Sequence, residues 1–218
     1  MFKNKVFWDY FDNFAAPNLA FRANTFRKMF EYLESIDGPV TIVETGCVRI
    51  EGNWGDGQST ILFDKYISSR DSDSICYTVD INPRSVAECK KLVSNRIQVS
   101  QGDSIAYLHQ LTKTLAEKKQ FIALAYLDSY DIDWANWHPS ASHHLQELTA
   151  LLPCINTATL VTVDDSPLNG YFTLGSKNQI MFTQNPVVAG KGRLVAEYAS
   201  QTGAKLVFSS YQVGWTGF

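Results

Sequence analysis

The sequence predicts an α/β domain in which helices cover both faces of a mostly parallel sheet. Short β-branched and apolar runs recur along the chain and alternate with segments of helical periodicity. An acidic or polar residue directly follows most of the apolar runs. Alternation of strands and helices is typical of a parallel sheet with crossover helices, and ligands bind such sheets at the carboxyl ends of the strands.

The predicted elements cover most of the chain. Strands are expected at 40–43, 75–79, 97–99, 121–127, 159–163 and 205–211. Helices are expected from 59 onward, at 85–94, from 104 to 115, at 143–152 and at 193–202. Residues 1–37 mix aromatic residues with helical spacing and predict an N-terminal helical region. No linker interrupts the pattern, so residues 1–218 are expected to form a single domain.

The net charge and the distribution of apolar residues indicate which kinds of ligand and cellular location to expect. The formal net charge of −3 offers no basic surface for nucleic acid, so a small-molecule substrate is expected. No apolar stretch is long enough to span a membrane, and the N-terminal residues lack the apolar segment of a signal peptide. We therefore expect a cytoplasmic protein without membrane contact, while assembly into a homo-oligomer stays open.

The residues after the predicted strands carry the chemical signal. Glu44 and Gly46 follow the first strand, Asp80 the second, Asp103 the third and Asp128 the fourth. A single aspartate after a strand is commonly only a turn or helix cap. Four such positions in register favour a ligand site at this edge of the sheet.

This order resembles that of the class I S-adenosylmethionine (SAM) dependent methyltransferases, which have a Rossmann-like sheet. The resemblance covers roughly residues 40–165. It implies that Glu44 and Gly46 form the turn beside the amino-acid part of SAM. It further implies that Asp80 binds the ribose hydroxyls and that Asp103, with Ser104, lies beside the adenine.

The loop after the first strand departs from the compact glycine turn of that family, because it runs from 46 to 59. Its end, Gly57-Gln58-Ser59, resembles the G-x-S that closes this loop in sugar and macrolide O-methyltransferases. The resemblance implies that Gly57 and Ser59 belong to the cofactor site.

Three aspartates predict a divalent metal. Asp128 follows the fourth strand and the pair Asp164-Asp165 follows the fifth, so neighbouring strands would bring the three carboxylates together. Such hard oxygen ligands suit Mg²⁺. The pattern resembles metal-dependent O-methyltransferases of the catechol and macrocin types, which implies that the ion aligns and acidifies an acceptor hydroxyl, with a sugar-like or secondary-metabolite acceptor.

Histidines after the fourth strand are candidates for a general base. His138, His143 and His144 lie where a base could reach the acceptor, and Asp128 is placed with His138 and His143 as a catalytic residue. Two other functions stay open. One is an NAD-dependent oxidoreductase, although the tight G-x-G-x-x-G of that class is missing. The other is a non-catalytic SAM-binding partner protein.

Overall fold

The computed structural model describes residues 4–56, 58–70, 73–169, 172–174, 180–182 and 187–218. The main strands are β1 (Thr41–Thr45), β2 (Ile75–Asp80), β3 (Ile97–Gln101), β4 (Leu124–Leu127), β5 (Leu160–Val163), β10 (Lys205–Ser209) and β11 (Val213–Thr216). They form one seven-stranded sheet in the order β10-β11-β5-β4-β1-β2-β3.

The sheet is parallel except for one strand. β1 pairs in parallel with β2 and with β4, and the pairs β2–β3 and β4–β5 are also parallel. β11 runs antiparallel to both β5 and β10. This confirms the predicted Rossmann-like, mostly parallel sheet. The carboxyl ends of β1 to β5 meet at one edge.

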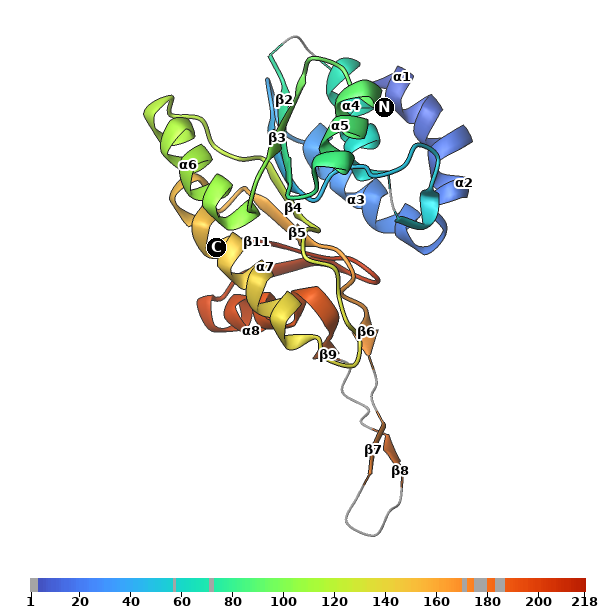
Figure 1. Cartoon of the computed structure of the whole chain (residues 1–218), viewed down its shortest axis with the longest axis vertical. Helices are drawn as coiled ribbons and strands as arrows, with labels where there is room; N and C mark the ends of the chain where they lie inside the picture. Colours follow the sequence, from blue (N-terminus) through green and yellow to red (C-terminus); the bar gives the residue numbers. More distant parts are fainter. Residues whose placement is uncertain (1–3, 57, 71–72, 170–171, 175–179, 183–186) are drawn as a thin grey trace.

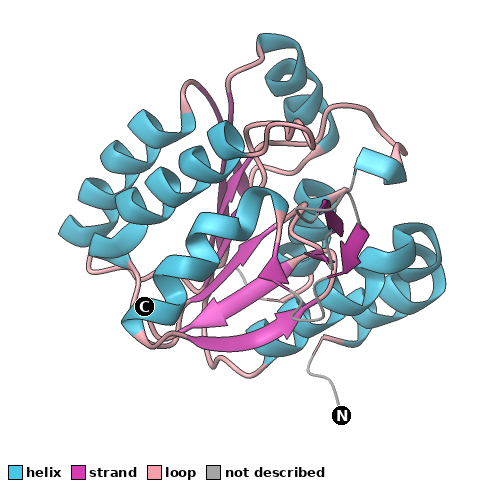
Figure 2. Cartoon of the chain, turned by 90° about the horizontal axis from the view of Figure 1, so that it is seen from below, coloured by secondary structure: helices cyan, strands magenta, loops and turns pink. Residues whose placement is uncertain are grey.

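Helices cover both faces of the sheet (Figure 2). They are α1 (Lys5–Tyr10), α2 (Ala16–Leu19), α3 (Ala23–Glu34), α4 (Ser59–Ser68), α5 (Pro83–Leu92), α6 (Ser104–Glu117), α7 (His138–Leu151) and α8 (Arg193–Thr202). In Figure 1, α1 to α5 lie on one side of the sheet and α6 to α8 on the other. The sheet is thus shielded from water on both faces, as its continuous apolar strands require.

The strands divide their side chains between two hydrophobic cores because successive residues point to opposite faces. Ile42 and Tyr126 pack into the core beneath the N-terminal helices and α4. Val43 and Leu127 pack into the core beneath α6, α7 and α8. These four side chains are fully buried. Burial of a large apolar side chain stabilises the folded state by on the order of 1.5–3 kcal/mol.

The N-terminal region folds as successive short helical segments. α1 passes through a π-helical turn (Phe11–Ala15) into α2, and a 3-10 turn (Ala20–Arg22) leads into α3. Its aromatic rings interlock with α4: Phe30 lies 4.5 Å from Phe7 and 5.1 Å from Tyr66, between ring centroids. The region is therefore an integral wall of the first core.

The sequence and the structure differ most after β5. The segment 205–211, expected as one strand, is β10 followed by a turn into β11. Among the described residues between β5 and α8 are four short strands that the sequence did not predict: β6 (Leu168–Asn169), β7 (Phe172–Leu174), β8 (Ile180–Phe182) and β9 (Val187–Val188). They pair as β6–β9 and β7–β8, and Figure 1 shows the second pair beyond the first, away from the sheet. Within the described ranges, no helix has the length and apolarity needed to cross a bilayer.

Candidate active site

Two adjoining cavities open at the carboxyl edge of the sheet. The first has a volume of about 410 Å³ and lies over the ends of β1, β2 and β3. The second has a volume of about 310 Å³ and lies over the ends of β1, β4 and β5. Gly46, Arg49 and Asp131 contribute to the walls of both. Two ligands bound side by side would therefore meet at Gly46.

The first cavity contains four of the predicted cofactor residues: Gly46, Asp80, Asp103 and Ser104. Asp80, at the end of β2, accepts hydrogen bonds from the backbone N–H of Asn82 at 2.7 Å and of Cys47 at 3.3 Å. Asp103 accepts from the N–H of Ala106 at 2.9 Å and so caps α6. Asp80 and Asp103 therefore each bind the local backbone and also line the cavity.

An apolar surface accompanies these acids in the first cavity. Ile81 and Tyr130 line it, and their side chains are 72% and 50% exposed. Apolar surface gathered in a cavity beside a few polar groups is typical of a ligand site. A planar, partly apolar group could pack against them while its polar edges reach Asp80 and Asp103.

Gly46 allows the chain to turn between the two cavities. Its φ of +78° lies in the left-handed region, and its N–H donates to the carbonyl of Val79 at 2.8 Å. A Cβ at this position would lie 2.5 Å from the carbonyl oxygen of Asp128. Only glycine fits both the dihedral angle and this close approach.

The remaining predicted cofactor residues lie elsewhere. Ser59 begins α4 and lines the second cavity. Gly57 lies outside the described residues. Glu44 is fully buried and lines neither cavity; its Oε2 accepts a hydrogen bond from Thr60 Oγ1 at 2.8 Å, and burial raises its pKa to about 7. Glu44 thus anchors the start of α4 rather than facing a ligand.

A buried carboxylate supports the first cavity from below, and sequence reasoning missed it. Glu147 on α7 accepts hydrogen bonds from Ser129 Oγ at 2.6 Å and Thr45 Oγ1 at 3.1 Å. His143 Nε2 lies 3.3 Å from Glu147 and 2.8 Å from Ser104 Oγ. Burial by itself would raise the pKa of Glu147, but hydrogen bonds led by that of His143 hold it below its ordinary value. The spacing of His143 and Glu147, one helical turn apart, was the available signal.

His143 and His138, both predicted as candidates for a general base, lie in different surroundings. His143 lines the first cavity, beside the predicted cofactor residues. His138 is exposed at the first turn of α7, stacks on Trp137 at 3.9 Å between ring centroids, and lines neither cavity. α7 begins at His138 and not at 143 as expected, and Pro139 sits in its first turn, where proline is tolerated.

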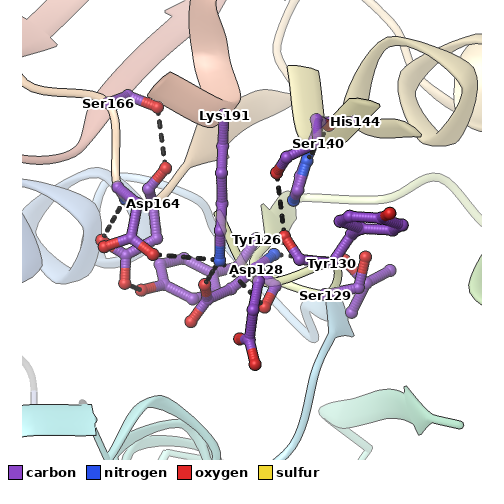
Figure 3. A network of polar contacts seen from close by, with 12 residues as sticks. Tyr126, Asp128, Ser129, Tyr130, Ser140, His144, Asp164, Ser166 and Lys191 are labelled. Carbon is purple, nitrogen blue, oxygen red and sulfur yellow. Dashed lines mark hydrogen bonds and ion pairs between the residues drawn. The ribbon is translucent and has the colours of Figure 1, made fainter. Parts of the chain in front are cut away.

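The second cavity is dominated by charged groups. Lys191, in the 3-10 turn Gly190–Gly192, is only 1% exposed and reaches down between Asp164 and Asp128 (Figure 3). Its Nζ lies 2.6 Å from Asp128 Oδ1 and 3.0 Å from Asp165 Oδ2. Burial would lower the pKa of Lys191, but these carboxylates raise it above its ordinary value, so the side chain stays charged.

Asp164 is fully buried and its carboxylate is saturated. It accepts hydrogen bonds from Tyr126 OH at 2.8 Å, from Arg22 Nε at 3.2 Å and from the backbone N–H of Asp165 at 2.8 Å. Arg22 comes from the N-terminal region and also contacts Asp165 at 3.4 Å. The cluster is therefore an ion-pair network formed by the N-terminal region, β5 and the 190–192 turn.

The three carboxylates predicted as metal ligands do lie together, but their surroundings do not fit Mg²⁺. Asp164 is occupied by Arg22 and Tyr126, and the Lys191 ammonium stands between Asp128 and Asp165. In the described part of the chain, no three acidic, histidine or cysteine side chains form a metal-binding group. The expected magnesium centre is corrected accordingly: two protein cations, Arg22 and Lys191, form ion pairs with these three carboxylates.

The sequence indicates Lys191 and Arg193 only as basic residues for a phosphate or carboxylate of the acceptor; it does not place Lys191 among the three carboxylates, and it does not indicate Arg22 at all. The signal for Lys191 was the glycine on each side of it. A Cβ on Gly190 would lie 2.0 Å from the carbonyl oxygen of Asp165, and one on Gly192 would lie 2.5 Å from Ser166 Oγ. Both glycines let the turn pack closely enough to bury the lysine. Nothing in the local sequence marks Arg22, whose partner is 142 residues away.

Comparison with known proteins gives likenesses of fold. No protein-family model matches the sequence, and no curated protein sequence matches it. A solved structure of a DhpI-SAH complex covers 95% of this chain and 88% of its own, at 9% identity and a TM-score of 0.47. CalO1, a methyltransferase in calicheamicin biosynthesis in its SAH-bound form, covers 90% of this chain and 54% of its own, at 13% identity and a TM-score of 0.43.

A short-chain dehydrogenase/reductase from Brucella melitensis is also similar. It covers 58% of this chain and 56% of its own, at 14% identity and a TM-score of 0.41. At these identities and TM-scores the likenesses carry no argument, and function must be inferred from the site. The chain has a Rossmann-like, mostly parallel sheet, with two adjoining cavities at the edge where ligands of such sheets bind.

Proposed function

We propose that this protein is a SAM-dependent methyltransferase that acts on a small polar acceptor. The observation that carries the proposal is the pair of adjoining cavities at Gly46. The first presents Asp80 and Asp103 beside the apolar surface of Ile81, which suits a nucleoside with ribose hydroxyls and a flat base. The second is lined mainly by polar and charged side chains, which suits a polar acceptor.

The protein would contribute position and proton transfer. SAM supplies an activated methyl group when bound. In the proposed arrangement Asp80 accepts hydrogen bonds from the ribose, Asp103 and Ser104 lie at the base, and the Gly46 turn leaves room where the two cavities meet. Asp128, with Oδ1 held by Lys191, keeps its second carboxylate oxygen for a proton of the acceptor. Fixing both reactants in this way is the main source of acceleration in a displacement reaction.

We propose an oxygen acceptor, in keeping with the carboxylates of the second cavity, which can accept a hydrogen bond from a neutral hydroxyl. Sugar-like and secondary-metabolite acceptors belong to this class. A cytoplasmic location, no nucleic-acid or membrane partner, and a single catalytic domain over 1–218 complete the proposal. Self-association into a homo-oligomer is compatible with it.

Isothermal titration calorimetry with S-adenosylhomocysteine (SAH), SAM and NAD⁺ tests the proposal. We expect one SAH per chain and no heat from NAD⁺. Bound SAH should also raise the melting temperature, because a ligand that binds only the folded state stabilises it. NAD⁺ binding without SAH binding would instead assign an oxidoreductase. SAM binding together with no SAH formation across a panel of hydroxylated acceptors would favour a non-catalytic binding protein.

A further inference from the structure

Lys191 occupies the centre of the carboxylate cluster in the second cavity. We propose that its ammonium group is a built-in cation that stands in the position of a divalent metal ion among Asp128, Asp164 and Asp165. The acceptor cavity of the proposed methyltransferase is then independent of metal. The inference rests on the proposed function only for the meaning of that cavity, since the cation site itself is defined by contacts within the chain.

The contacts of Lys191 resemble those of a bound ion. Nζ lies 2.6 Å from Asp128 Oδ1 and 3.0 Å from Asp165 Oδ2, so carboxylates from the ends of two neighbouring strands converge on it. Its third N–H has the Asp128 carbonyl oxygen at 3.5 Å as a weak partner. Since Lys191 lines the second cavity, this is the donor that it can offer to an acceptor oxygen there.

The charge of the cluster agrees with this role. Asp128, Asp164 and Asp165 face two cations, Arg22 and Lys191, which leaves one net negative charge. A divalent ion added beside Lys191 would reverse the sign and repel a buried ammonium that is 1% exposed. Without the Lys191 charge the cluster would carry two net negative charges, which a divalent ion would neutralise.

The glycines around Lys191 show that its position is built into the backbone. Gly190 adopts a φ of +63°. The turn that contains it packs against Asp165, because the backbone N–H of Lys191 donates to the Asp165 carbonyl at 3.1 Å. Gly192 N–H donates to Ser166 Oγ at 2.8 Å. These bonds fix the backbone of the turn on the strand end that supplies the carboxylates, so the base of the Lys191 side chain is held beside them.

Mn²⁺ binding tests the inference without any acceptor. Electron paramagnetic resonance reports free Mn²⁺, which would be titrated with the wild-type protein, Lys191→Ala and Lys113→Ala. Lys113 is exposed on α6 and lies outside both cavities, so its variant controls for the loss of a surface charge. Circular dichroism and thermal unfolding establish that each variant is folded, and SAH titration of the same samples reports on the first cavity.

We expect Lys191→Ala to differ from the wild type and from Lys113→Ala in its affinity for Mn²⁺. Wild type and Lys113→Ala should leave the free Mn²⁺ signal unchanged at millimolar ion, whereas Lys191→Ala should bind one Mn²⁺ per chain at least tenfold more tightly. Adding Asp165→Asn to Lys191→Ala should abolish that binding. Tight 1:1 binding of Mn²⁺ by the wild type that is lost in Asp165→Asn would overturn the inference, even if Lys191→Ala does not fold.

A folded Lys191→Ala protein that binds no Mn²⁺ would also overturn it, because the ammonium would then not mark a metal position. Neither result depends on the cofactor. Failure of SAH binding in the wild type would count against the proposed function and leave the cation site unaffected.

Discussion

Asp80 has two tasks at the end of β2. It holds the loop after β1 through the N–H of Cys47, and it lines the first cavity. A variant of the same shape therefore tests both tasks, and thermal unfolding of the variant reports on the loop separately from ligand binding. Asparagine removes the charge and retains one carbonyl oxygen, which can accept from only one of the two N–H donors, because Asn82 N–H donates to Oδ1 and Cys47 N–H to Oδ2.

Asp80→Asn should weaken SAH binding by about 1–3 kcal/mol, because hydrogen bonds from ribose hydroxyls to a charged acceptor would be lost. Calorimetric titration measures the change. Asp9→Asn, an exposed change on α1, is the control and should leave the affinity as it is. Equal affinities in the two folded variants would show that Asp80 does not bind the ribose.

Gly46→Ala tests the close approach between the two cavities. A residue with a Cβ at positive φ costs about 1–2 kcal/mol, and a clash with the Asp128 carbonyl should add about 1–3 kcal/mol. Gly38 is a matched control, because its φ is +80° and a Cβ there meets nothing within 4 Å. Urea unfolding should show a clearly larger loss for Gly46→Ala than for Gly38→Ala, and equal losses would mean that the chain relaxes around the clash.

At the scale of elements, the N-terminal helices are tied to the sheet through Arg22. Its guanidinium pairs with the fully buried Asp164 at the end of β5 and also donates to the Gly55 carbonyl at 3.2 Å. It thereby joins the 3-10 turn before α3, the 46–57 loop and the sheet edge. This ion pair therefore helps to hold the carboxyl edge of the sheet together.

Arg22→Met should lower the free energy of unfolding by about 3–5 kcal/mol, because the buried Asp164 would lose its cationic partner. Arg193→Met is the matched control, since Arg193 pairs with Glu197 at the surface of α8 and such pairs contribute about 0–1 kcal/mol. Denaturant unfolding of both variants measures the difference. Comparable small losses would indicate that Asp164 is protonated or hydrated once Arg22 is removed.

α7 carries a group whose titration should appear in the pH dependence of stability. His144 is fully buried, its Nδ1 lies 2.7 Å from the Ser140 carbonyl, and burial lowers its pKa to about 4. The unfolded chain binds a proton on this histidine at an ordinary pKa of about 6.5. The folded state resists that proton, so the stability contribution is intact above pH ~6.5 and is lost as the pH falls toward 4.

His144→Leu should flatten the pH dependence of unfolding between about 6.5 and 4, where wild type loses on the order of 3 kcal/mol through this group. His109→Gln, at an exposed position on α6, should keep the wild-type slope. Urea unfolding at several pH values checks both. An unchanged slope in folded His144→Leu would mean that the buried ring takes up its proton as readily as the unfolded chain does.

At the scale of the whole molecule, local sequence patterns predict the strands and helices, whereas contacts between residues far apart in the chain cannot be predicted from such patterns. Apolar runs such as 159–163 and the polar residues after them were sufficient to predict the sheet, its two covered faces and the edge that holds the cavities. The hairpin of β10 and β11 was missed because a tight turn within an apolar segment leaves little trace in periodicity.

The charged cluster shows the limit most clearly. The sequence predicted that Asp128, Asp164 and Asp165 would meet, because strand order alone brings them together. It could not show that Arg22 and Lys191 would reach them, since 142 residues separate Arg22 from Asp164 and 63 separate Lys191 from Asp128. The same three aspartates after neighbouring strands are expected whether a metal ion or a lysine side chain pairs with them, so the sequence pattern does not distinguish the two cases.

The wall shared by the two cavities has a consequence for how two ligands would bind. Gly46, Arg49 and Asp131 face both spaces, so the occupant of the first cavity completes the surface that the second ligand meets. Affinities coupled in this way are reciprocal: the factor by which one ligand favours the other is the same in both directions. In the proposed function, bound cofactor and bound acceptor would therefore each increase the affinity of the other by the same factor, whichever of them binds first.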